Sequence, residues 1–330
     1  GAAAATSAPW APVDARLQSI ITSGDATGLS LRVMTGGRTV YNKAFGTDWT
    51  TNTFVPAWST TKMATATAIM ALVDRRKLKL STRVTAVLPW FDDSDPGKAR
   101  VTLGQLLAHT SGLPGIFGNA PCIGDPATTM DACGRQIAGL TRIGTPGTVF
   151  AYSGSDLQVA ALMAQTVSKQ PWTAFFSNAL IKPCRLNWQW NSQTNPRVAA
   201  GGSTDPASVM KILQIQESGG FCGRRRILSE AAVTAMQADH QRGTTINYTP
   251  YPGRSHGLGE WRDRVSRGRA WIVSSPGVGG TYPWVDLRHG YRAYLNVAGN
   301  PISPATYQWS AKAASDLFKL VPAALKGGRR

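Results

Sequence analysis

The strongest constraint on the fold is a run of helix-forming residues that begins at Ser59. The residues after Lys62 are rich in Ala, Met, Leu and Ile, and this segment contains no Gly or Pro for more than a dozen residues. A short apolar segment, residues 54–57, leads into this run. Such a run predicts a buried helix that starts at or near Ser59. Ser59 and Lys62, three residues apart, then share one face of the first helical turn.

Two interpretations of this pair differ in what the lysine does. In the structural one, Ser59 caps the helix and Lys62 is a solvated charge. However, a capping box would place Glu or Gln at the lysine position, and a lysine there opposes the positive end of the helix dipole. In the catalytic one, Lys62 takes the proton of the Ser59 hydroxyl, which is a poor nucleophile without a base. Lysine is a base when burial or nearby positive charge disfavours its ammonium form. The pattern is too short to decide alone, so it needs partners elsewhere in the chain.

Composition indicates a globular protein. The chain has 330 residues, of which 42% are hydrophobic and 16% charged, enough for one large core or two domains. No apolar run reaches the roughly 18 residues that predict a membrane span. The net charge of +17 is compatible with an anionic partner, but the basic residues are spread along the chain, apart from clusters at 224–226 and 262–269. No nucleic-acid motif accompanies them. We therefore predict a solvated basic surface, no nucleic-acid partner and at most a weak association with anionic surfaces.

The first residues and the cysteines predict an exported protein. Residues 1–9 are mostly small and lack charge, like the remnant left after a signal peptide is removed, so we expect a secreted or periplasmic protein. Four cysteines suit two disulfides, for which three pairings exist. Cys122 and Cys133 bracket a short loop rich in Gly, Pro and Asp, so we pair them, which leaves Cys184 with Cys222. A metal site is not expected, because there is no C-x-x-C and the four His are scattered.

The order of predicted elements gives an α+β architecture. Alternating residues split by Gly36-Gly37 predict a hairpin near the N-terminus, and strands return after about residue 255. The predicted strands are 29–33, 39–45, 270–274, 282–286 and 291–297; the predicted helices are 12–23, 59 to about 75, 101–109, 157–168, 173–180, 208–216, 229–238 and 304–325. We expect an antiparallel sheet flanked by helices, built from 1–84 plus 255–330, with a mostly helical domain, 85–254, inserted. The cleft between the two domains is the expected active site.

Two further motifs follow the serine–lysine pair in order. One is Phe150-Ala-Tyr-Ser-Gly154, on a turn before a predicted helix, and the other is Gly277-Val-Gly-Gly-Thr281, which leads into a late strand. With these motifs and the stretches 101–114 and 256–261, the sequence resembles the serine β-lactamase and penicillin-binding-protein superfamily over nearly its whole length. The branch that it resembles in particular is that of class C-like β-lactamases and related esterases. The resemblance implies a β-lactamase/transpeptidase-like fold and no cofactor.

The same resemblance implies a role for each motif. Ser59 would be the acylated nucleophile and Lys62 its proton partner. Tyr152 would be the second base, which activates Ser59 or the deacylating water and protonates the leaving group. The backbone N–H groups of Ser59 and Thr281 would form the oxyanion hole. Aromatic side chains near the cleft would hold an apolar acyl or alcohol group, and the other residues expected at the substrate are Gly154, Val278, Gly279 and Gly280.

Two of these positions depart from the family's pattern. Gly154 stands where the second motif commonly has Asn, and Val278 stands where the third motif usually begins with Lys or His. Val278 offers neither a cation nor a donor to a substrate carboxylate, which counts against β-lactams and peptidoglycan stems. We therefore expect an exported serine hydrolase that cleaves a small-molecule or oligomeric ester, or a lactone, through an acyl-enzyme on Ser59. The alternatives are a β-lactamase or a D-amino-acid peptidase or amidase with the same machinery, and a catalytically inactive binding protein of the same fold.

Three other residues imitate catalytic groups. We expect His109 and Ser111 to hydrogen-bond a helix end and a turn, because no aspartate that would complete a triad is evident. Ser255 lies in Gly253-Arg-Ser-His-Gly257, which matches the nucleophile elbow of α/β-hydrolases. That elbow needs a strand before it and a helix after it, and the flanking sequence predicts neither.

Overall fold

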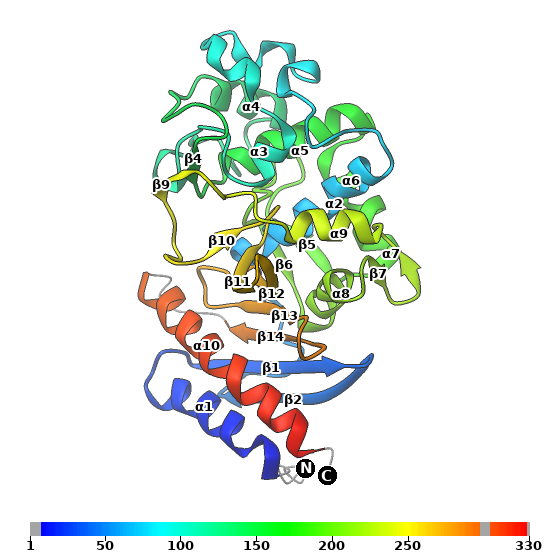
Figure 1. Cartoon of the computed structure of the whole chain (residues 1–330), viewed down its shortest axis with the longest axis vertical. Coiled ribbons are helices and arrows are strands. Elements are labelled where there is room, and N and C mark those ends of the chain that lie inside the picture. The colour runs from blue at the N-terminus through cyan, green and yellow to red at the C-terminus, as the bar shows by residue number, and fades with distance from the viewer. Residues whose placement is uncertain (1–7, 298–303, 329–330) are drawn as a thin grey trace.

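A seven-stranded antiparallel sheet forms one end of the molecule. The computed structural model describes residues 8–297 and 304–328. The strand order is β10-β11-β12-β13-β14-β1-β2, with bounds β1 Gly28–Thr35, β2 Arg38–Gly46, β10 Ser255–His256, β11 Trp261–Ser266, β12 Arg269–Ser274, β13 Tyr282–Asp286 and β14 Tyr291–Val297. Leu29 of β1 lies opposite Val297 of β14. Strands from the two ends of the sequence therefore lie side by side (Figure 1).

The N-terminal hairpin follows directly from its sequence. Gly36 and Gly37, at φ of +55° and +76°, connect β1 to β2, and a two-residue turn of this kind needs positive φ at both central positions. The alternate residues Leu29, Leu31 and Val33 are fully buried. The predicted hairpin is thus present, one to two residues longer at each end than expected.

Two helices from opposite ends of the chain cover one face of the sheet. They are α1, Ala11–Thr22, and α10, Pro304–Gly327, which lie next to each other over the strands (Figure 1). Val13 and Leu17 of α1 share an apolar cluster with Leu317 of α10 and with β1 and β14. Burial of this apolar cluster is the main favourable contribution to the packing of α1 and α10 against the sheet.

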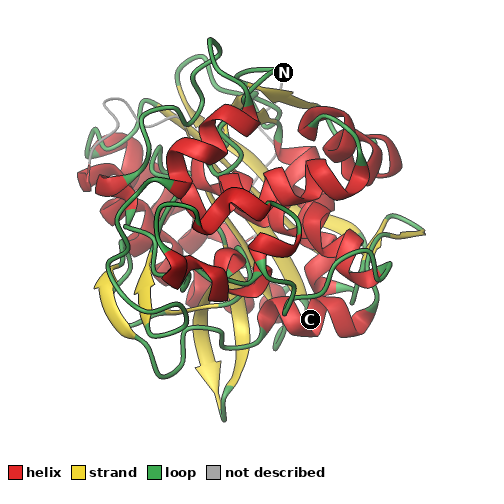
Figure 2. Cartoon of the chain, turned by 90° about the horizontal axis from the view of Figure 1, so that it is seen from above, coloured by secondary structure: helices red, strands yellow, loops and turns green. Residues whose placement is uncertain are grey.

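Helices of the middle of the chain also pack against the sheet, and helices and loops make up most of the molecule when it is seen from above (Figure 2). The helices of the middle are α2 Thr61–Asp74, α3 Leu103–Leu107, α4 Met130–Ala138, α5 Ser155–Ser168, α6 Trp172–Phe176, α7 Lys182–Cys184, α8 Pro206–Glu217 and α9 Glu230–Gln237. α8 contacts β13 and β14, and residues 61–72 of α2 are all buried. One apolar cluster runs from Val273 and Val285 of the sheet into α2 and α5. Because the core is continuous, the boundaries of a helical domain at 85–254 stay a prediction.

The structure adds elements that the sequence analysis did not predict. α4 begins after Thr129, whose hydroxyl accepts from Ala132 N at 3.1 Å, so Cys133 lies in a helix and not at the end of a loop. β11 pairs with β10 and β12. The predicted helix 173–180 is α6 followed by a π-helical turn, Ser177–Ile181, just before Pro183, which has no N–H to continue an α-helical pattern.

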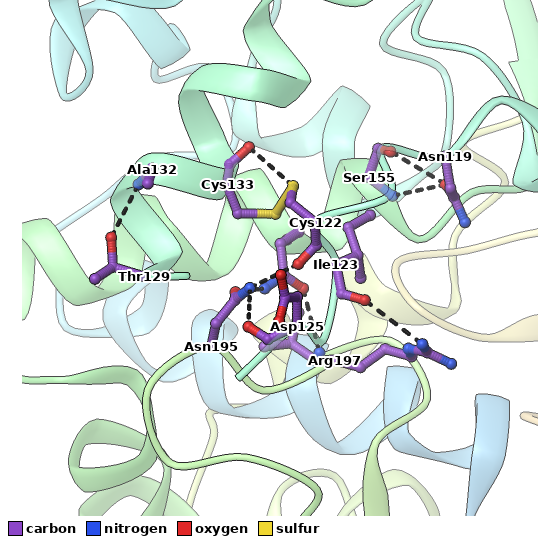
Figure 3. Close-up of a disulfide and its surroundings, with 12 residues drawn as sticks. Asn119, Cys122, Ile123, Asp125, Thr129, Ala132, Cys133, Ser155, Asn195 and Arg197 are labelled. Carbon is purple, nitrogen blue, oxygen red and sulfur yellow. Dashed lines mark hydrogen bonds between the residues drawn. A yellow bond between two sulfur atoms is a disulfide. The ribbon is translucent and has the colours of Figure 1, made fainter. Parts of the chain in front are cut away.

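Both predicted disulfides are present. Cys122–Cys133 ties a loop to α4, and Asn195 Nδ2 donates to Cys122 O at 2.7 Å beside it (Figure 3). Cys184–Cys222 ties α7 to β7, Phe221–Cys222. Two disulfides are typical of proteins that fold in an oxidising compartment.

Among the helices of residues 8–297 and 304–328, none has the length and hydrophobicity needed to cross a membrane. Most of the predicted signal-peptide remnant, residues 1–7, lies outside the described residues.

The disulfide between Cys122 and Cys133 can be tested by its contribution to stability. Replacing both cysteines with Ala should lower the free energy of unfolding by about 3 kcal/mol, because the bond restricts a short loop in the unfolded chain. Urea denaturation followed by circular dichroism measures this change. A variant that unfolds at the same urea concentration as the wild type would contradict it.

Candidate active site

Ser59 lies on a tight turn that leads into α2. The turn is the 3-10 helix η2, Trp58–Thr60, so the helix starts two residues later than the sequence predicted. Trp58 has a φ of +49°, a sparsely populated conformation for a residue with a side chain, and such strain concentrates at functional sites. Ser275 Oγ donates to Ser59 O at 2.9 Å, and Thr60 Oγ1 donates to Ser275 O at 2.7 Å. The turn is thus fixed to the segment that follows β12.

Lys62 points back at Ser59. Its Nζ donates to Ser59 Oγ at 3.0 Å and to Ala199 O at 3.1 Å, and its side chain is 3% exposed. Among the ion pairs of the described residues, none involves Lys62. Burial lowers the pKa of Lys62 to about 7. A large share of the lysine is therefore neutral at pH 7 and can accept the serine proton.

Tyr152 completes the group. Lys62 Nζ lies 4.5 Å from the centre of its ring, and the Ser59 side chain acts on its hydroxyl, which lowers the pKa of Tyr152 against the larger effect of burial. Its backbone is held on both sides: Tyr152 N donates to Tyr248 O at 3.0 Å, and Ile116 N donates to Tyr152 O at 2.9 Å. Burial raises the pKa of Tyr152 above its ordinary value, so the resting side chain is a phenol that can donate a proton. Of the two possible bases, Lys62 is the one that this environment deprotonates.

The third motif packs directly against the Ser59 turn. Gly280 N donates to Gly277 O at 3.0 Å and Gly277 N to Thr281 O at 2.8 Å, which fold the motif into a tight turn before β13. A Cβ on Gly277 would lie 2.8 Å from Ala57 O, and one on Gly279 would overlap the indole of Trp58. Thr281 Oγ1 donates to Ala57 O at 3.3 Å. These contacts bring together the two segments whose N–H groups, those of Ser59 and Thr281, are the predicted oxyanion donors.

An asparagine that the sequence analysis missed lies at the second motif. Asn119 Oδ1 accepts from Ser155 N at 3.1 Å (Figure 3) and from Gly154 N at 3.0 Å. It also accepts from the hydroxyls of Ser153 and Ser155. These backbone donors fix the orientation of the amide. A Cβ on Gly154 would lie 3.0 Å from Asn119 Nδ2, so the carboxamide of Asn119 occupies the space beside the glycine. Asn119 is 35 residues before Gly154, and no local pattern marked it.

The buried histidine and serine of residues 101–114 are structural. Ser111 Oγ donates to Asp156 at 2.5 Å and accepts from Leu113 N at 3.0 Å, and His109 Nδ1 lies 3.2 Å from the other Asp156 oxygen. In a catalytic triad the histidine lies between the serine and the aspartate. Here Asp156 lies between His109 and Ser111, so the three residues do not form a triad. Burial raises the pKa of Asp156 and lowers that of His109. The cluster joins the end of α3 to the start of α5 beneath Tyr152, and Asp156 is the partner that the sequence analysis did not find.

The elbow-like serine is not a nucleophile elbow. Ser255 lies in β10, and β11 follows it, not a helix. Its hydroxyl accepts from Arg262 Nη1 at 2.9 Å.

Comparison with known proteins agrees with this geometry. A family model described as Beta-lactamase matches residues 13–314. The chain belongs to the β-lactamase family. Penicillin-binding protein 4 of Amycolatopsis lactamdurans is 32% identical over 230 residues, which cover 63% of this chain and 58% of that protein. Protein flp of Staphylococcus aureus (strain COL) is 27% identical over 191 residues, 56% of this chain and 38% of flp. The chain therefore spans only about two fifths to three fifths of the length of these relatives.

Several solved structures share the fold of this chain over more than nine tenths of its length. A putative β-lactamase from Bacteroides dorei is 26% identical, with a TM-score of 0.82 over 93% of this chain and 98% of that one. EstCE1, a hydrolase with promiscuous acyltransferase activity, has a TM-score of 0.76 at 19% identity over 92% and 98% of the two chains. A family VIII carboxylesterase has a TM-score of 0.70 at 16% identity over 94% and 99%. The resemblance and the β-lactamase/transpeptidase-like fold that the sequence predicted are confirmed.

The pKa of Lys62 predicts how the reactivity of Ser59 depends on pH. Neutral Lys62 is the form that accepts the proton, so labelling by a fluorophosphonate should accelerate as pH rises through about 7 and level off above about pH 8. With an ordinary lysine the rise would continue to about pH 10. Labelling rates between pH 5 and 10 measure the profile. Lys62→Ala should label negligibly, and a wild-type profile without an inflection near pH 7 would contradict this role.

The role of Asn119 can be tested by a pair of variants. Asn119→Ala should lower the free energy of unfolding by about 1 kcal/mol, because the N–H groups at the start of α5 lose their acceptor. Asn119→Asp keeps an acceptor and places a negative charge at the helix N-terminus, so it should be as stable as the wild type. Thermal unfolding compares the two, and equal stability of the Ala and Asp variants would show that the contact is unimportant.

Proposed function

We propose that this protein is an exported serine hydrolase that cleaves carboxylic esters, or lactones, through an acyl-enzyme on Ser59. The observation that carries the proposal is the contact of 3.0 Å between Ser59 Oγ and the buried Nζ of Lys62. Family membership and the esterase structures of the same fold support it.

In the proposed acylation, neutral Lys62 takes the Ser59 proton while Ser59 Oγ attacks the ester carbonyl. Negative charge then develops on the carbonyl oxygen, where the N–H groups of Ser59 and Thr281 would stabilise it. Tyr152, a phenol because burial raises its pKa, would pass a proton to the departing alkoxide. Water then attacks the acyl-enzyme, and the proton transfers reverse: Tyr152 takes a proton from the water and Lys62 returns one to Ser59 Oγ.

Two features favour an ester over a substrate with a carboxylate. Val278 in the third motif carries no charge. In addition, the two segments that hold the backbone of Tyr152 carry exposed apolar side chains. Phe117 is 89% exposed and its ring lies 5.0 Å from that of Tyr248, and Ile246 is 54% exposed. Exposed apolar groups beside a reactive centre fit an apolar acyl or alcohol group of a substrate.

The alternative with the same machinery is hydrolysis or trapping of an amide, including a β-lactam. The similarity to penicillin-binding protein 4 over 230 residues favours it. A catalytically inactive protein of the same fold is the other alternative, because Gly154 and Val278 depart from the family's pattern.

Intact-protein mass and released nitrophenolate separate these possibilities. With p-nitrophenyl esters the wild type should turn over, and with penicillin G it should form no lasting adduct. Ser59→Ala should lower ester turnover at least about 10³-fold, because the nucleophile is lost. Ser255→Ala, the other serine with a catalytic-looking motif, is the matched control and should keep full activity.

A stable penicilloyl adduct on Ser59 would instead assign the protein to the penicillin-binding group. Silence toward esters, penicillin and a fluorophosphonate together would leave the inactive binding protein. Near-native turnover by Ser59→Ala would refute the proposed nucleophile.

A further inference from the structure

A cavity of about 980 Å³ shares no lining residue with the candidate active site. Its lining residues come from the β1–β2 hairpin, α7, α8, β14 and the turn after β7. Seven of its lining residues are basic: Arg32, Lys182, Arg185, Lys211, Arg224, Arg225 and Arg292. Within the described part of the chain, none of its lining residues is acidic.

Some of these cations are already neutralised or anchored. Arg292 is buried and pairs with Glu217, so it adds little net charge. Arg32 donates to Asn42 Oδ1 at 3.1 Å and to Asn52 Oδ1 at 2.8 Å, which fixes the guanidinium. It forms no ion pair within the described residues, although the negative charge of Asp205 acts on it. The cavity therefore keeps a positive wall even after its internal contacts are counted.

Three arginines are different, because they are exposed and have no ion pair among the described residues. They are Arg185, Arg224 and Arg225. The neighbouring Arg226 is not part of the cavity lining: it stacks on the Phe221 ring at 4.1 Å and donates to Gly219 O at 3.2 Å. The three free guanidiniums thus have their donors available to a ligand.

A covalent bond holds these like charges together. The disulfide Cys184–Cys222 joins the segment that carries Lys182 and Arg185 to the segment that carries Arg224 and Arg225. Like charges brought together repel each other, and this repulsion lowers the stability of the folded state unless an anion lies between them. Because the disulfide holds the two segments together despite this repulsion, the basic residues stay close to one another in the absence of a ligand.

We propose that this cavity binds a soluble linear anion that carries several phosphate groups. A guanidinium donates two parallel hydrogen bonds to a phosphate, and several unpaired guanidiniums suit several phosphates. The volume lies within the range of small-ligand sites, about 300–1,000 Å³, and exceeds the size of one phosphate. The site acts independently of Ser59 and does not rest on the proposed hydrolase activity.

Calorimetric titration with sodium tripolyphosphate at 150 mM salt tests the proposal. A triple variant, Arg185→Gln with Arg224→Gln and Arg225→Gln, should weaken binding at least about tenfold, because charge-assisted hydrogen bonds are lost. The control variant, Arg242→Gln with Arg267→Gln and Arg269→Gln, removes the same charge from exposed positions outside the cavity. It should change the affinity less than about twofold.

The comparison separates a site from general charge. Equal weakening in both triple variants would overturn the proposal, since binding would then follow net charge. So would an absence of tripolyphosphate binding, or cavity-dependent binding to phosphatidylglycerol vesicles without any to tripolyphosphate. Turnover of p-nitrophenyl esters should be the same in both variants, which separates this site from Ser59.

Discussion

A lysine buried without a carboxylate is the interaction on which the candidate active site depends. Removing an ammonium from water costs free energy unless a negative charge compensates it, and Lys62 has a serine hydroxyl, a backbone carbonyl and an aromatic ring as neighbours. The nearby His109 and His256 are buried too, and their pKa values are lowered, so they add no charge of their own. A carboxylate in this place would make a stronger contact with Lys62 but would keep the lysine protonated. The site is therefore less stable than one with a carboxylate partner, but it keeps Lys62 in a form that can accept a proton.

The rest of the fold keeps that lysine beside its serine. Residues 61–72 of α2 are all buried, so packing around the helix holds the Lys62 side chain in place. The sheet contributes through the segment after β12 and the turn before β13, which hold the backbone of Ser59 and Ala57. Glycines at 277 and 279 allow this close approach, because a Cβ at either position would collide with the serine turn. Chain segments more than 200 residues apart therefore set the position of one hydroxyl group.

Several elements of the fold could be predicted from local sequence patterns. Strands β13 and β14 begin and end at the predicted residues, and the hairpin followed from its two glycines. The family resemblance located the three motifs, and the structure brings Ser59, Lys62 and Tyr152 together. The catalytic roles themselves stay predictions until activity is measured.

What could not be predicted are contacts made across space. Asn119 reaches the start of α5 from a loop 35 residues away, and Asp156 joins His109 and Ser111 from another helix. Nothing in the local sequence of these residues distinguishes them from surface polar groups. The basic cavity is a similar case, because its charges come from strands, helices and a turn that the chain visits at widely separated points.

The pairing of β1 with β14 has a consequence for synthesis. β1 emerges early from the ribosome, but its partner strand is made near the end of the described chain. Contacts of such high sequence separation slow folding, and the apolar face of the first hairpin stays uncovered until the last strands arrive. Since the turn before β13 also completes the surroundings of Ser59, this predicted nucleophile gains all its neighbours only after residues 277–281 have been made. The proposed hydrolase should therefore have no activity on the ribosome before the third motif has been made.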